Sequence, residues 1–208
     1  MNLILLGPPG AGKGTMASGI KERYSIPHIS TGDIFRTAIK NQTEIGKQVQ
    51  AIIAEGSLVP DELTVALVEE RIQQDDAKDG FILDGFPRTI PQAEAFERIS
   101  KIDTVLDFAI PHEKVIKRLT GRRICRTCGE IYHVETKQPK VEGICDLDGG
   151  ELYIRPDDME DSIRHRLEVY DAQTAPLIAF YKEKGLMKVV DAEKGIEETL
   201  NSIFELLG

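Results

Sequence analysis

The chain opens with MNLILLGPPGAGKGT, residues 1–15, and this stretch decides the fold. After Asn2, a short apolar run is bounded by Gly and Pro, which predicts a buried strand of a parallel sheet. The following glycines let the backbone curl so that successive N–H groups form a concave nest for an anion. A helix predicted over residues 13–24 directs its positive N-terminal end to the same place, where Lys13 adds a cation. The stretch therefore predicts a phosphate-binding loop.

The spacing of this loop fits the P-loop pattern of nucleotide triphosphate-binding proteins, with one departure. Four residues separate Gly7 from Gly12, and Lys13 follows directly. The general pattern then has Ser or Thr as a Mg²⁺ ligand, whereas here Gly14 intervenes and the hydroxyl comes at Thr15. An ordinary Gly-rich turn is the alternative, and the order of strand, glycines, lysine and helix disfavours it. The motif predicts a bound nucleotide triphosphate but does not specify the reaction.

The composition is that of a globular protein with an acidic surface. The chain has 208 residues, of which 41% are apolar and 29% charged, with a net charge of −9. This length is enough for one sizeable core with small inserted subdomains. No apolar run approaches the ~20 residues of a membrane helix, no signal peptide fits before the first strand, and the charge opposes general nucleic-acid binding. With three cysteines and no secretory signal, we expect a cytoplasmic protein without a disulfide framework.

Helical and strand-like segments alternate along the chain. Beside the first strand, further strands are predicted over residues 27–30, 81–84, 104–110 and 187–191. The predicted helices are 13–24, 34–40, 43–55, 61–74, 91–100, 113–120, 161–184 and 195 onward, with N-caps at Thr43 and Asp61 and a kink at Pro176. Five strands separated by helices predict an α/β fold, in which a P-loop five-stranded parallel sheet has helices on both faces. Ligands bind beyond the carboxyl ends of such strands, so the polar clusters after residues 6, 29 and 83 should meet in one crevice.

Three motifs carry a resemblance to a known family. GPPGAGKGT (7–15), STGDIFR (30–36) and DGFPRT (84–89) resemble, in order and spacing, the motifs of nucleoside monophosphate kinases. They are most similar to those of the adenylate kinase family, in its bacterial form with a long zinc-binding lid. The resemblance covers the whole chain and implies reversible transfer of the terminal phosphoryl group from Mg-ATP to AMP, giving two ADP. It also implies a monomer, and the charge and the short apolar runs lead us to expect neither a nucleic acid nor a membrane as a partner.

The same resemblance divides the chain into three parts. Residues 1–29, 60–120 and 159–208 are expected to form a CORE P-loop domain, residues 30–59 a helical NMP-binding domain, and residues 121–158 a small LID domain. If water reached bound ATP, hydrolysis would compete with transfer, so the site must close before the reaction. We therefore expect both insertions to close over the nucleotides, with hinges at their boundaries.

The resemblance also implies which residues contact the nucleotides. The expected ATP contacts are Gly10, Ala11, Gly12, Lys13, Gly14, Thr15, Arg118, Arg122, Ile131, Tyr132 and Lys194. The expected AMP contacts are Thr31, Arg36, Ser57, Leu58, Val59, Gly85, Phe86, Pro87, Arg88, Gln92, Arg155 and Arg166. The residues expected to act in catalysis are Lys13, Arg88, Arg122, Arg155 and Arg166.

These residue types suit phosphoryl transfer. The transition state spreads charge over the phosphate oxygens, so the protein must position the groups and neutralise charge. Guanidinium groups match phosphate geometry bidentately, and the acceptor phosphate is already an anion, so we assign no general base. The family implies that Asp33 and Asp84 hold Mg²⁺ through its water shell, which would explain how Gly14 replaces a hydroxyl ligand. We expect Asp157 and Asp158 to pair with arginines and tune lid closure.

The LID segment contains a predicted structural metal site. Cys125 and Cys128 are separated by two residues, and Cys145 and Asp148 repeat this spacing. Two such turns can supply the four ligands of a tetrahedral Zn²⁺ site, and a site closed by protein ligands should stabilise the lid rather than catalyse. A metal-free lid and His133 as the fourth ligand are the alternatives, although only Asp148 completes the symmetric spacing.

Other classes of function are disfavoured. A GTPase switch would need a guanine-recognising Asn-Lys-x-Asp segment, which the sequence lacks. A zinc-ribbon nucleic-acid binder would account for residues 121–158, but the acidic balance opposes it. A kinase for another nucleoside monophosphate is the closest alternative, and Thr31 and Gln92 match adenine-type enzymes. His28, His112 and His165 show no partner spacing and are expected to be structural.

Overall fold

The computed structural model describes residues 1–208 and contains the predicted parallel sheet. Its strands are β1 (Asn2–Leu6), β2 (His28–Ser30), β3 (Phe81–Asp84), β4 (Thr104–Ala109) and β8 (Met187–Asp191). They lie in the order β2-β3-β1-β4-β8, and every neighbouring pair is parallel. Strand β1 is central and buried from Leu3 to Leu6, which is why its sequence is apolar without alternation. The predicted fold class is confirmed.

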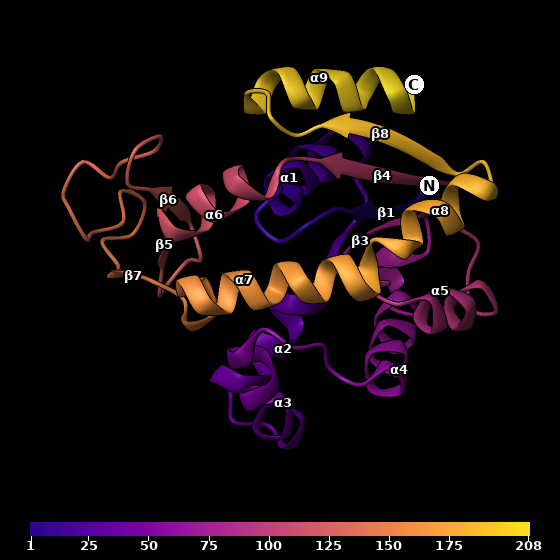
Figure 1. Ribbon diagram of the computed structural model, residues 1–208, viewed down its shortest axis with the longest axis horizontal. Helices are drawn as coiled ribbons and strands as arrows, with labels where there is room; N and C mark the ends of the chain where they lie inside the picture. Colours follow the sequence, from indigo (N-terminus) through magenta and orange to yellow (C-terminus); the bar gives the residue numbers. More distant parts are fainter.

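Helices cover both faces of the sheet (Figure 1). One face packs against α1 (Lys13–Tyr24) and α9 (Ile196–Leu207) through a cluster of 13 buried apolar residues. The other packs against α4 (Asp61–Ile72), α5 (Ile90–Glu97) and α8 (Pro176–Glu183) through a cluster of 14. Because both clusters are continuous, the sheet is rigid and only its ends are free to carry a site. No helix combines the length and apolar character that crossing a membrane would require.

The segment of residues 30–59 is helical, as predicted. It contains α2 (Thr31–Lys40) and α3 (Glu44–Glu55), which pack together around Phe35 and Val49. Helix α2 begins three residues earlier than predicted, because Ser30 accepts a hydrogen bond from the Asp33 N–H and caps it directly after β2. The predicted cap at Thr43 is confirmed by its hydrogen bond from the Gly46 N–H.

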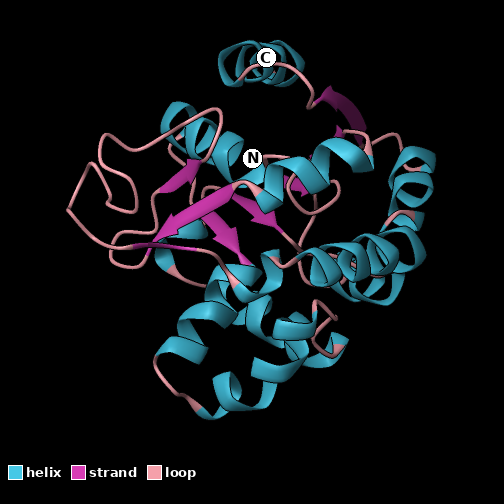
Figure 2. Ribbon diagram, turned by 60° about the vertical axis from the view of Figure 1, so that its left-hand side comes forward, coloured by secondary structure: helices cyan, strands magenta, loops and turns pink.

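The segment of residues 121–158 leaves the sheet after α6 (His112–Thr120) and returns through a short 3₁₀ turn, Pro156–Asp158. It contains a separate antiparallel sheet of β5 (Arg122–Cys125), β6 (Ile131–His133) and β7 (Leu152–Tyr153), in the order β6-β5-β7. Much of the remainder is loop, and the segment projects beyond the ends of the main strands (Figures 1 and 2). Its own buried cluster has only three residues, Cys125, Tyr132 and Cys145. So small a core needs a further source of stability.

The long helix predicted over residues 161–184 is interrupted just before Pro176, as expected. It consists of α7 (Glu160–Val169), a π-helical turn (Tyr170–Thr174) and α8. Proline has no N–H to continue the helical hydrogen bonds. The chain widens there, and the Ala175 N–H donates to the Tyr170 carbonyl at 2.8 Å, five residues earlier.

The predicted N-cap at Asp61 is wrong. Pro60 is the N-cap of α4 and Asp61 is already its first helical residue. The Asp61 carboxylate instead accepts hydrogen bonds from Thr89 and Gln92, which lie at the start of α5. A long-range partner has therefore replaced the local capping interaction. The remaining element, a 3₁₀ turn at Asp75–Ala77, joins α4 to β3.

Candidate functional site

The polar clusters at the ends of β1, β2 and β3 lie together, as predicted. Strand β3 pairs with both of the other strands. Thr31 Oγ1 donates to the Gly85 carbonyl at 2.9 Å, which joins the ends of β2 and β3. A Cβ placed on Gly14 would lie 3.7 Å from Asp84 Oδ2, so the start of α1 faces the end of β3. The three motifs thus form one site.

The P-loop presents free backbone N–H groups beside a lysine. Gly10 and Gly12 have φ angles of 77° and 92°, in the left-handed region that other residues rarely adopt. Gly12 is the N-cap of α1 and no side chain caps the helix, so its first N–H groups lack intrahelical partners. Lys13 Nζ donates to the carbonyls of Gly7 and Pro8, both at 2.8 Å, which holds the ammonium against the loop. Such an arrangement is suited to bind phosphate.

Lys13 is half-buried among charges of both signs. Burial lowers the pKa of Lys13 to about 8, and Arg88 and Arg166 act in the same direction. Asp84 and Asp107 oppose them and raise this pKa. At neutral pH the Lys13 side chain therefore stays mainly protonated, although burial destabilises its charged form. A bound polyanion would stabilise the charged form and raise this pKa.

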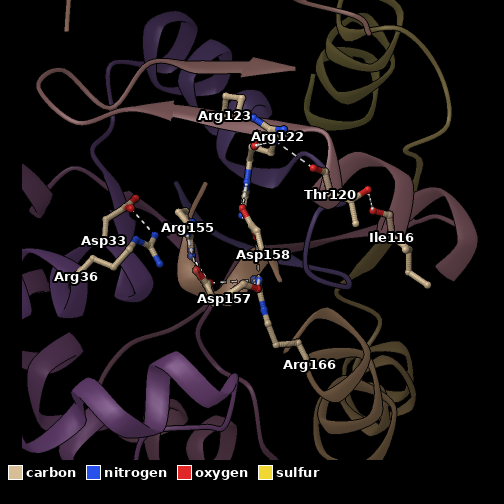
Figure 3. Close-up of polar contacts among 10 residues, drawn as sticks. All are labelled: Asp33, Arg36, Ile116, Thr120, Arg122, Arg123, Arg155, Asp157, Asp158 and Arg166. Atoms are coloured by element: carbon tan, nitrogen blue, oxygen red, sulfur yellow. Dashed lines mark hydrogen bonds and ion pairs between the residues drawn. The ribbon is translucent and has the colours of Figure 1, made fainter. Parts of the chain in front are cut away.

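Arginines from both sides of the LID segment converge on two buried aspartates. Asp158 lies between Arg122 and Arg166 (Figure 3). Arg122 donates to it twice, from Nε at 2.7 Å and from Nη2 at 2.6 Å. Arg155 Nε donates to Asp157 Oδ1 at 2.8 Å, and Arg166 Nη1 lies 3.2 Å from Asp157 Oδ2. The predicted pairing of these aspartates with arginines is confirmed.

This network predicts an acid-dependent loss of stability. Burial would raise the pKa of Asp157, but Arg155 and Arg166 lower it to about 2, below the ordinary value of 3.8. The native state therefore gains stability from this group above pH 3.8 and loses it as the pH falls towards 2. We expect Asp157→Asn to lower the free energy of unfolding by about 2 kcal/mol at pH 7, and by much less near pH 2.

Urea unfolding of the wild type and the variant at pH 7, 4 and 2.5 would measure this difference. The control is Asp75→Asn, because Asp75 has an exposed side chain that pairs only with Lys78. A pH-independent difference for Asp157→Asn would mean that the substitution acts through packing and not through the charge.

The monophosphate side of the site carries two further arginines. Arg88 Nε donates to the Gly85 carbonyl at 2.8 Å, and Arg36 forms an ion pair with Asp33. Burial lowers the pKa of Arg36, and Arg155 acts in the same direction. Burial likewise lowers the pKa of Arg88.

The site as a whole carries an excess of positive charge. Its six cationic side chains are Lys13, Arg36, Arg88, Arg122, Arg155 and Arg166, and its five carboxylates are Asp33, Asp84, Asp107, Asp157 and Asp158. The chain as a whole has a net charge of −9. A local positive excess in an acidic protein favours a small anion of high charge.

Two of the expected AMP contacts have side chains in the core. The Phe86 ring is 1% exposed and packs edge-to-face on Phe96, with ring centroids 5.3 Å apart. Pro87 is also buried. Any contact that these residues make with a nucleotide must therefore come from the backbone. Gln92, in contrast, places its buried side-chain amide between Arg88 and Asp61.

The connector between α3 and α4, residues 56–60, approaches α7. Ser57 Oγ lies 3.1 Å from His165 Nε2, so this histidine has a polar partner that no sequence spacing indicated. Leu58 is half-buried, and Val59 is buried against Phe35 and Val49. The Val59 side chain thus anchors the connector, and only its backbone is free to face a ligand.

The expected ATP contacts divide into two groups. Arg118 joins the P-loop to the loop after β8, because it donates to the Ala192 carbonyl at 2.8 Å and to the Ala11 carbonyl at 3.4 Å. Lys194, two residues after Ala192, pairs with Glu198 at 2.8 Å. In the LID segment, Ile131 is exposed, but the Tyr132 side chain is 3% exposed and its hydroxyl accepts from the Asp146 N–H. The Tyr132 ring is therefore part of the LID interior.

The four predicted metal ligands lie together. The ligand atoms of Cys125, Cys128, Cys145 and Asp148 are all within 4.8 Å of one another. The sulfurs of Cys128 and Cys145 lie 3.6 Å apart, and Cys125 Sγ lies 3.3 Å from Asp148 Oδ1. A tetrahedron with Zn–S bonds of about 2.3 Å has S···S edges of about 3.8 Å, so the donor set fits Zn²⁺. His133 is outside the group, and its Nδ1 accepts from the N–H groups of Glu135 and Thr136.

Comparison with known proteins agrees with this geometry. The family model described as adenylate kinase matches residues 5–186. The chain belongs to the adenylate kinase family. The adenylate kinase of Treponema denticola is 58% identical over 202 residues, which is 97% of both chains. Those of Caldicellulosiruptor saccharolyticus and Staphylococcus aureus are each 52% identical and cover 100% of this chain and 99% of their own.

Three residues in this adenylate kinase family member have site partners that sequence analysis missed. His28 Nε2 lies 3.3 Å from Asp84 Oδ2, although 56 residues separate them. Asp107 is 7% exposed within β4, where it pairs with Leu6 at the end of β1, and burial raises its pKa while Lys13 opposes the rise. A carboxylate inside an otherwise apolar strand is unusual, and this feature of the sequence could have indicated that Asp107 belongs to the site. Asp61 accepts a hydrogen bond from Gln92, whereas its sequence context predicts only a helix cap.

Proposed function

We propose that the protein catalyses reversible transfer of the terminal phosphoryl group from Mg-ATP to AMP, giving two ADP. The observation that carries this proposal is the convergence of six cationic side chains on the P-loop and the two neighbouring strand ends. Two anionic nucleotides that meet at one point require such an excess of positive charge. The family to which the chain belongs supports the same reaction.

The residues have distinct proposed roles. The N–H groups of the P-loop and Lys13 bind the phosphates of ATP, and Arg36 and Arg88 bind the phosphate of AMP. Arg122, Arg155 and Arg166 neutralise the charge of the group in transit. The acceptor oxygen is already anionic, so in-line transfer proceeds without a general base.

Mg²⁺ would be held through its water shell by Asp84 and Asp33, and would offset the charge of the β- and γ-phosphates. Asp84 fits this role because it ends β3 and faces Gly14, where the general P-loop pattern has a hydroxyl ligand. Asp33 is paired with Arg36, so its part in binding the ion depends on how that pair rearranges.

We propose that residues 30–59 and 121–158 close over AMP and ATP respectively, while the rest of the chain stays fixed. The two continuous core clusters support a rigid remainder. The aspartates between the LID arginines keep those cations in place, where they can meet phosphate on closure. Closure would exclude water and so prevent hydrolysis.

The test is ADP formation from Mg·ATP with AMP, GMP, CMP, UMP or no acceptor. We expect fast turnover with AMP and negligible hydrolysis without an acceptor. Preference for another monophosphate would retain the mechanism and overturn the acceptor assignment. Phosphate release without any acceptor would identify an ATPase and contradict the proposed closure.

We further propose that the cluster of three cysteines and Asp148 binds one structural Zn²⁺. The LID segment has only three buried core residues of its own, so the metal would supply much of its stability. We expect one zinc per chain by elemental analysis. We also expect chelation, or Asp148→Asn, to lower the Tm by about 5 °C or more, because 1 kcal/mol corresponds to roughly 2–4 °C at this chain size.

Glu142→Gln is the matched control for this prediction, because Glu142 is an exposed acid of the same segment outside the ligand group. Its Tm should match that of the wild type, both with and without chelator. A purified protein without zinc and with a Tm insensitive to chelator would show that the lid is metal-free.

A further inference from the structure

The Gln92 side chain is buried with a defined amide orientation. It is 1% exposed, and Oε1 accepts a hydrogen bond from the Arg88 N–H at 2.7 Å. Its Nε2 donates to Asp61 Oδ1, also at 2.7 Å. A backbone N–H can only donate, and an ionised carboxylate can only accept. The two partners therefore determine which end of the amide is oxygen and which is nitrogen.

Rotation of the amide by 180° would be unfavourable at both ends. Oε1 would then face the Asp61 carboxylate, and Nε2 would face the Arg88 N–H. Two acceptors would meet at one end and two donors at the other, on a side chain that is itself almost inaccessible to solvent. Thr89 strengthens the arrangement, since its hydroxyl also donates to Asp61 Oδ1, at 3.1 Å, and accepts from the Gln92 N–H.

Half of the hydrogen-bonding capacity of this amide is not used by the protein. A glutamine amide has two N–H donors and two oxygen lone pairs. Asp61 and Arg88 take one of each, which leaves one N–H and one lone pair in a defined order. The same Arg88 donates from Nε to the Gly85 carbonyl, which also accepts from Thr31. The free edge of Gln92 is therefore coupled to the arginine proposed to bind the acceptor phosphate.

An ordered donor–acceptor pair distinguishes purines that differ at position 6. Adenine has an amino donor at position 6 and an acceptor at N1, whereas hypoxanthine has an acceptor at position 6 and a donor at N1. If both bases lie in the same place, one orientation of the Gln92 amide matches adenine and only the rotated amide matches hypoxanthine. Rejection of the wrong base then depends on what prevents this rotation.

We propose that Asp61 is a specificity-determining positioning residue, which fixes the orientation of the Gln92 amide and thereby favours 6-amino over 6-oxo purine monophosphates. This inference rests on the proposed function, because it takes Gln92 to contact the base of the acceptor. Asp61 itself does not contact the nucleotide. It acts through Gln92.

The test replaces Asp61 with asparagine, which has a similar shape but can present either an oxygen or an amide nitrogen to Gln92. Both amide orientations then find a partner at that end. The measurement is kcat/KM for AMP and for IMP with saturating Mg·ATP, together with the KM for ATP. We expect the AMP-to-IMP ratio of kcat/KM to fall at least about tenfold, with the KM for ATP unchanged.

Glu62→Gln is the matched control. Glu62 is the next residue in the first turn of α4, is exposed, and forms no hydrogen bond to α5. The substitution removes the same charge from the same helix end, and the AMP-to-IMP ratio should stay within about twofold of the wild type. If Asp61 merely supports the fold, Asp61→Asn will lower activity with AMP and IMP equally, and the proposal is wrong.

The wild type separates this inference from the proposed function. A wild type that prefers an acceptor other than AMP overturns the proposed function, whatever Asp61 does. A wild type that prefers AMP, together with an Asp61→Asn variant of unchanged ratio, overturns only the role of Asp61.

A measurement on the wild type covers the case in which the variant does not fold. The side-chain amide protons of Gln92, observed by NMR with ¹⁵N-glutamine labelling, should include one that is hydrogen-bonded to Asp61. We expect this proton to stay hydrogen-bonded when AMP binds, while its partner proton shifts. Loss of the Asp61 bond on binding would show that the amide reorients, and would contradict the proposal.

Discussion

Lys13→Met is expected to lower kcat for ADP formation by at least about a thousandfold, in the range seen when an enzyme loses a cation that stabilises a transferring phosphoryl group. Lys13 lies against the P-loop, with its ammonium bonded to the Gly7 and Pro8 carbonyls. Methionine has a similar length but no charge and no donors. The loss should affect the transition state more than substrate binding, because negative charge on the phosphate oxygens is redistributed during transfer.

Steady-state kinetics with AMP and Mg·ATP would measure this loss, and thermal unfolding would show that the variant is folded. Lys21→Met is the control, because Lys21 is an exposed residue on the same helix, and its kcat should equal that of the wild type. If Lys13→Met keeps kcat within tenfold, the P-loop lysine does not act on the reacting phosphate and its proposed role must be abandoned.

Arg88→Lys is expected to lower kcat/KM for AMP by about a hundredfold or more, and to leave the KM for ATP within about threefold. The substitution keeps the positive charge but removes the planar pair of donors that matches a phosphate. It also removes the Nε–H that bonds to the Gly85 carbonyl, so the new ammonium is not held in place. Two charge-assisted hydrogen bonds at about 1.5–3 kcal/mol each account for the size of the effect.

Arg98→Lys is the matched control, since Arg98 is the exposed C-cap of α5 and the same chemical change there should have no effect. An equal rise in the KM for ATP would instead place Arg88 between the two nucleotides. Full activity of Arg88→Lys would mean that charge alone suffices at this position, and that bidentate binding is not used.

The parts of the fold that sequence predicted well are those set by local patterns. The apolar run of β1, the glycines of the P-loop and the helix after it are adjacent in the chain, so each constrains the next. The cap at Thr43 also depends only on neighbouring residues. The cysteine spacing in the LID segment indicated a cluster for the same reason, because each pair lies on one tight turn.

The wrong cap at Asp61 and the missed partner of His28 both depend on residues that are distant in the chain. Asp61 has the sequence context of a helix cap, yet it bonds to residues 28 and 31 positions further along. The spacing of His28 indicated no partner, and only the pairing of β2 with β3 places it beside Asp84. The nucleotide contacts expected of Tyr132 and Phe86 stay predictions, and the structure adds that their rings fill the interior of the LID segment and the core.

The sequence by itself determined the class of the protein. It predicted a parallel α/β sheet, a phosphate-binding loop, three polar clusters at strand ends and two tight turns that together carry four metal ligands. Those features follow from periodicity and short spacings, which act within a few residues. Only the tertiary structure decided which aspartate pairs with which arginine, and which way the Gln92 amide is oriented. Charges and amides select partners over distances of a few ångströms, and residues far apart in the chain come that close only when the packing of the sheet and helices brings them together.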